Sequence, residues 1–120
     1  MTDDRTLVLR SLIAFEQPLG AILRRLADFG WDSERPLAEL QAADVVRVLQ
    51  VFMNGNVTAS DIESWANALE GREDIVLEGG NADTLSAALF HFANPTLTEP
   101  LTIDDAKRWV EKLSEHHQPN

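Results

Sequence analysis

The chain has 120 residues, a size typical of one domain, and its 44% hydrophobic and 25% charged residues indicate a globular protein. Because it contains no cysteine, disulfides, thiolate nucleophiles and Cys-ligated metal sites are excluded. A net charge of −10 disfavours binding to nucleic acid or to an anionic membrane, since both depend on clustered Lys and Arg.

The amino terminus, residues 1–4, is acidic and does not resemble the basic start of a signal peptide. No apolar run approaches the roughly 20 residues that a membrane span needs. We therefore expect a cytoplasmic protein of bacterial type.

The first two helices are predicted on either side of Pro18. The first begins near Asp3 or Asp4 and ends before Pro18, because a residue that precedes proline is disfavoured in a helix. The second begins at Pro18 and ends at Gly30, which provides a left-handed cap; one kinked helix is the alternative. Their apolar stripes are Leu9, Leu12, Ile13 and Phe15 in the first, and Leu19, Ile22, Leu23, Leu26 and Phe29 in the second.

Residues 31–41 are predicted to form a loop with a short turn after Pro36, followed by a third helix over residues 42–53. Four valines in that stretch make a strand the competing interpretation. The length of the stretch and the stop signal at Asn54 and Gly55 favour the helix.

A capping box between Thr58 and Asp61 predicts the start of a fourth helix, which ends at Gly71. The helix buries an apolar stripe that includes Trp65. Residues 54–61 also resemble half of a calcium loop, but Gln50 and Phe52 stand where such a loop needs hard oxygen ligands. Helix caps explain the same residues without a metal.

The spacing predicts a fifth helix over residues 82–93 and a sixth from Thr102, whose side chain caps it, with a frayed tail from about residue 115. The short run at residues 75–77 does not decide between extended and irregular structure. The sixth helix is expected to turn Ile103, Ala106, Val110 and Leu113 toward the core. Together these elements predict an all-α fold, a single-domain irregular or orthogonal bundle of about five to six helices over residues 1–120.

Residues 61–83 form an acid-rich segment with seven carboxylates and one base, Arg72, which gives a local charge of −6. Concentrated charge of this kind attracts a basic partner; a merely solvated acidic face is the plain alternative. Arg72 is expected to pair locally or to reach back to the end of the fourth helix. The predicted partner-binding residues are Glu63, Glu70, Arg72, Glu73, Asp74 and Glu78.

The sequence predicts no catalytic, cofactor or metal site. His91 has no second ligand at the helical spacing that metal sites use. Two alternatives stay open. One is a small metal-dependent enzyme that uses Glu73, Asp74, Glu78 and His91, and the other is a self-associating module that exposes Trp31 and Trp109.

The run from Asn54 to Ile75, with the later Phe92–Pro95 and Leu101-Thr102, resembles a family of small all-helical bacterial proteins. The pair Trp65-Ala66 and the run Arg72–Ile75 carry most of this resemblance. It implies a helical fold and no particular activity. In size and charge alone, the chain is also similar to immunity and antitoxin proteins, which suggests an acidic interaction module that binds a basic protein.

Overall fold

The computed structural model describes residues 4–30 and 33–117, and the predicted all-α class is confirmed within these ranges. The helices are joined by connections of different lengths, and the two longest each contain a three-residue strand. The elements in chain order are α1 (Asp4–Ile13), α2 (Leu19–Leu26), β1 (Ala38–Leu40), α3 (Ala42–Met53), α4 (Ala59–Leu69), β2 (Ile75–Leu77), α5 (Ala82–Ala93) and α6 (Ile103–His117).

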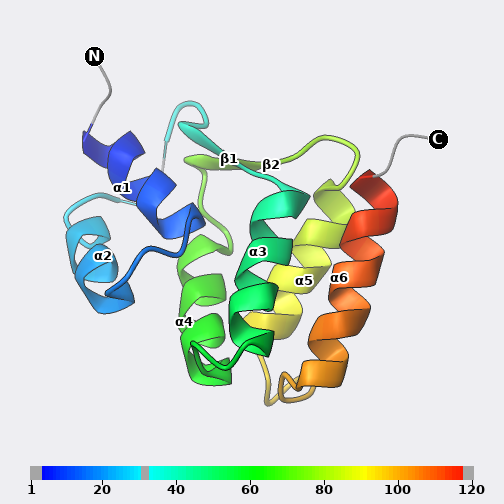
Figure 1. The fold of residues 1–120 in the computed structure, drawn as a ribbon. Coiled ribbons are helices and arrows are strands. Elements are labelled where there is room, and N and C mark those ends of the chain that lie inside the picture. Colours follow the sequence, from blue (N-terminus) through cyan, green and yellow to red (C-terminus); the bar gives the residue numbers. More distant parts are fainter. Residues whose placement is uncertain (1–3, 31–32, 118–120) are drawn as a thin grey trace.

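Figure 1 shows α3, α4, α5 and α6 side by side, with α3 packed against α6 and α4 against α5. The helices α1 and α2 pack on each other beside α4, and the two strands lie across one end of the helices. None of the described helices combines the length and the apolar character needed to cross a membrane.

Trp65 occupies the centre of the core, as its position in the apolar stripe of α4 predicted. Its side chain is fully buried, and its Nε1 donates a hydrogen bond of 2.6 Å to the carbonyl of Leu12. The ring of Phe15 meets the Trp65 ring edge-on, with 5.8 Å between the centroids. One side chain of α4 therefore anchors the end of α1 by both apolar contact and a hydrogen bond.

The middle of the chain folds as its local signals predict. The helix α3 spans the predicted residues, so the strand interpretation of its valines is wrong. Thr58 and Asp61 form the predicted capping box at the start of α4, where each side chain accepts a hydrogen bond from the other residue's amide. Gly71 has a φ of +80° directly after α4, a conformation that favours glycine.

The strands β1 and β2 form a parallel pair that the sequence did not predict. Ala38 lies opposite Ile75 and Leu40 opposite Leu77, and the connection between the strands contains α3 and α4. Residues 31–41 are thus not entirely loop. Three residues are too few for a periodic pattern, and their extended conformation depends on a partner far along the chain.

Two other local predictions need correction. The helix α1 ends at Ile13, before Pro18 as predicted, but α2 ends at Leu26, so its end does not lie at Gly30. Thr102 caps α6 as predicted, because its Oγ1 accepts a hydrogen bond from the Asp105 amide. Ile103, however, is 50% exposed and does not face the core. It is the first helical residue, where no neighbouring turn covers the side chain.

Candidate functional site

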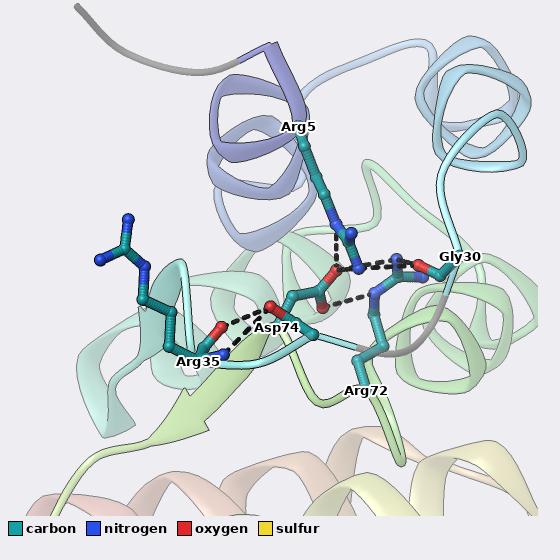
Figure 2. A network of polar contacts seen from close by, with 6 residues as sticks. Arg5, Gly30, Arg35, Arg72 and Asp74 are labelled. Atoms are coloured by element: carbon teal, nitrogen blue, oxygen red, sulfur yellow. Dashed lines mark hydrogen bonds and ion pairs between the residues drawn. The ribbon is translucent and has the colours of Figure 1, made fainter.

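Asp74, in the middle of the acid-rich segment, is a buried carboxylate between two arginines (Figure 2). Arg72, which follows α4, donates from Nε to Oδ1 of Asp74 at 2.9 Å and from Nη2 to Oδ2 at 3.1 Å. Arg5 of α1 donates from Nε to Oδ2 at 2.9 Å. We call Arg5, Arg72 and Asp74 the ion-pair network.

The ion-pair network also holds two loops in place. The carbonyl of Gly30, beyond the end of α2, accepts hydrogen bonds from Nη2 of Arg5 at 2.9 Å and from Nη2 of Arg72 at 3.1 Å. The carbonyl of Asp74 accepts the amide of Leu37 at 2.7 Å, just before β1. The network therefore joins α1, the segment after α2 and both strands at one point.

The charged form of Asp74 is favoured in this environment. Burial by itself raises the pKa of the carboxyl, but hydrogen bonds from Arg72 and Arg5 and the positive charges of both side chains outweigh that effect. The pKa of Asp74 therefore lies below its ordinary value. The carboxylate remains ionised at neutral pH, which is the state that the two guanidinium groups require.

These contacts correct the prediction that Arg72 and Asp74 belong to a partner-binding surface. Asp74 is 0% exposed and Arg72 is 8% exposed, so a partner protein cannot reach either without opening the interior. The expected local pairing of Arg72 is confirmed by its two hydrogen bonds to Asp74. The contribution of Arg5 was not predictable from local sequence, because Arg5 lies 69 positions before Asp74.

Two further carboxylates of the segment stabilise local structure while remaining partly exposed. Glu78 accepts hydrogen bonds from the amide of Ala42 at 3.1 Å and from Nδ2 of Asn81 at 2.8 Å, so it holds the start of α3 beside the turn before α5. Asp61 accepts the amide of Thr58 in the capping box. Glu78 is thus both a predicted partner-binding residue and a structural one.

Glu63, Glu70 and Glu73 are the other predicted partner-binding residues, and each lines a different hollow. Glu63, partly exposed on α4, lines a cavity of about 190 Å³. Glu70, at the end of α4, lines another of about 170 Å³. Glu73 is exposed and lines an open groove of about 720 Å³ beside Arg5 and Arg35. The three carboxylates are therefore exposed or partly exposed beside three separate hollows, and they share no pocket.

The residues of the enzyme alternative are separated in the fold. Asp74 is held in the ion-pair network, Glu78 bonds the start of α3, and Glu73 and His91 line different cavities. Such an arrangement does not provide the converging acid and base that catalysis by these four residues requires.

Of the two tryptophans in the self-association alternative, the structure describes Trp109. Trp109 is partly buried against His91 and Phe92, and the ammonium of Lys112 lies 4.9 Å from its ring centroid. Trp31 lies outside the described residues. Trp109 is therefore not the exposed tryptophan that the self-association alternative requires, because much of its ring is covered by its own helix and by α5.

Comparisons with protein families, with curated proteins and with solved structures gave no significant match to this chain. The chemistry of the site residues is thus the basis for any functional assignment.

Proposed function

We propose that this protein is an acidic protein–protein interaction module, similar in type to immunity proteins, which binds a basic protein through the accessible carboxylates of the acid-rich segment. The observation that carries the proposal is that the ion-pair network buries some charges of the acid-rich segment and leaves the others at the surface. It removes one base and one acid of residues 61–83 from the surface, so six carboxylates and no base remain there.

The same division makes the rest of the chain more acidic. With Arg5, Arg72 and Asp74 engaged with one another, eight basic and nineteen acidic side chains remain, a net charge of −11. Excess charge of one sign increases the rate at which an oppositely charged protein associates, and the effect weakens as salt screens the charges. A basic partner is therefore the chemistry that this surface fits.

The fold also holds the acidic surface in a fixed position. Glu70 and Glu73 lie on either side of Arg72, whose side chain is anchored to Asp74 and to the Gly30 carbonyl. A segment that is already ordered loses less conformational entropy when a partner binds. The network thus supports binding without contacting the partner.

The test is capture of proteins from an extract of the native host by the immobilised full chain at low salt. We expect the captured proteins to be basic, and to be lost when Glu63, Glu70 and Glu73 are all changed to Gln or when salt is raised. A matched control, Glu16→Gln with Asp28→Asn and Glu111→Gln, removes three exposed carboxylates outside the segment and should retain them. Equal loss with both triple variants would show that only total charge matters, and equal retention would remove the acid-rich segment from the proposal.

A further inference from the structure

His91 has a buried ring nitrogen that lacks a hydrogen-bond partner. The residue lies near the end of α5, with its ring against Phe92 and Trp109 at centroid distances of 6.0 Å and 5.6 Å. Within residues 4–30 and 33–117, no group forms a hydrogen bond with its Nε2. A buried polar atom without a partner is unfavourable by about 1–3 kcal/mol, so Nε2 of His91 is suited to bind a ligand.

Two carboxylates lie close to this ring. Glu99 comes from the connection between α5 and α6, and Asp105 from the first turn of α6. One potential ligand atom from each of His91, Glu99 and Asp105 lies within 4.8 Å of the other two. The three residues belong to different segments, which is why no ligand spacing was visible in the sequence.

The connection that carries Glu99 is anchored to α5. The single hydroxyl hydrogen of Thr98 is shared between the carbonyl of His91 at 3.1 Å and that of Asn94 at 2.9 Å. These bonds fix the residue before Glu99 directly over the backbone of His91. The Glu99 side chain itself is exposed and has freedom to turn toward the ring.

The donor set of one imidazole and two carboxylates suits a divalent transition metal. Zinc accepts nitrogen and carboxylate oxygen at about 2.0–2.2 Å, and three protein ligands leave a fourth position for water. Calcium and magnesium are less suitable, because they favour all-oxygen surroundings. The cavity of about 190 Å³ lined by Glu63, His91 and Glu99 provides space for that water.

Asp105 can supply an oxygen with a small local rearrangement. Its Oδ2 accepts hydrogen bonds from the amide and hydroxyl of Thr102, whereas its Oδ1 pairs with Arg108. The side chain of Arg108 is 65% exposed. Because the guanidinium of Arg108 is exposed to water, it can turn away from the buried Asp105 carboxylate and leave Oδ1 to a metal.

We propose that His91, Glu99 and Asp105 form a zinc-binding site between α5 and α6. Binding draws the ligand atoms from their present separations to roughly 3.4 Å, the distance that tetrahedral zinc imposes. The exposed side chain of Glu99 makes most of that movement. Glu63, which belongs to the acidic interaction surface proposed above, lines the same cavity, but the three proposed zinc ligands lie outside the acid-rich segment.

The test is titration of the full chain with zinc chloride, followed by calorimetry. His116 and His117 are an alternative pair of ligands, so the parent for all variants carries both as Gln. We expect the parent to bind one zinc ion per chain, and Glu99→Gln to raise the dissociation constant at least about tenfold, as loss of a ligand requires. The matched control, Glu111→Gln, removes an exposed carboxylate of α6 outside the cluster and should leave it unchanged.

A second measurement tests the histidine ligand as well. Zinc should raise the thermal midpoint of the parent and of Glu111→Gln, and should raise it less in Glu99→Gln and His91→Gln, because a ligand stabilises the state that binds it. The proposal is overturned if the parent binds no zinc, or if Glu99→Gln binds zinc as tightly as Glu111→Gln.

Discussion

Glu73 and Asp74 are adjacent carboxylates, but the fold gives them opposite surroundings. Glu73 is exposed and lines an open groove, whereas Asp74 is fully buried and accepts hydrogen bonds from two arginines. A buried charge is tolerated only when opposite charges and hydrogen bonds replace its water. Acidic residues that are dense in sequence can thus have two different environments, one buried and structural and one exposed to solvent.

The largest effect should come from breaking the ion-pair network at its most buried cation. Arg72→Met leaves the Asp74 carboxylate inside the protein with Arg5 as its remaining cation, and should lower the free energy of unfolding by about 3–5 kcal/mol. Arg5→Met should cost less, because the Arg5 side chain is 18% exposed and water can partly replace it. Urea denaturation of both variants measures the difference. An equal or larger loss for Arg5→Met would contradict the assignment of Arg72 as the principal partner.

Acid should weaken the same network. Because the pKa of Asp74 is lower in the folded state than in the unfolded chain, its contribution to stability is fully present above the unfolded pKa of about 3.9 and is lost as the pH falls below it toward the folded pKa. The stability difference between wild type and Asp74→Asn should therefore shrink as the pH is lowered below about 4. Denaturation curves from pH 3 to pH 7, roughly the range over which aspartate titrates, measure it. A difference that stays constant would show that the charge of Asp74 is not responsible.

A smaller effect is expected for the carboxylate that caps α4. Asp61→Ala removes the acceptor for the amide of Thr58 and should cost about 1 kcal/mol, typical of a lost helix cap. Ser60→Ala, at the exposed neighbouring position of the same helix turn, is the matched control and should change stability by less than about 0.5 kcal/mol. If the two variants are equally stable in thermal denaturation, the capping box contributes nothing measurable.

The smallest effect should come from the proposed binding carboxylates. Changing Glu63, Glu70 and Glu73 to Gln should alter stability by no more than about 0.5 kcal/mol per site, and relief of repulsion should make the change favourable at low salt. Salt should reduce the difference, because it screens exposed charges. A loss of several kcal/mol in chemical denaturation would mean that these residues are structural.

Local sequence signals predicted the parts of this fold that depend on local interactions. The limits of α3 and the capping box at Thr58 follow from stop and start signals within a few residues, and both are confirmed. The burial of Trp65 follows from its position in a helical stripe. These features need no knowledge of distant segments.

Features that depend on distant contacts were not predictable in the same way. Arg5 and Asp74 meet only because α1 packs beside the strands, and β1 becomes a strand only because β2 lies next to it. The sequence therefore placed Asp74 on the surface with its acidic neighbours. A sequence signal did exist for Arg72, because it is the one base among seven carboxylates, and a local pairing was expected without a named partner.

The most direct test of the difference between the buried Asp74 and the exposed Glu73 is to measure the stability of Glu73→Gln and Asp74→Asn side by side. Each variant removes one negative charge, and the two positions are neighbours. In urea denaturation at neutral pH, Asp74→Asn should lose about 3–5 kcal/mol of stability, because two guanidinium groups then lack their carboxylate. Glu73→Gln should stay within about 0.5 kcal/mol of wild type. Equal losses, or a larger loss for Glu73→Gln, would contradict the separation of this segment into a buried structural carboxylate and an accessible one.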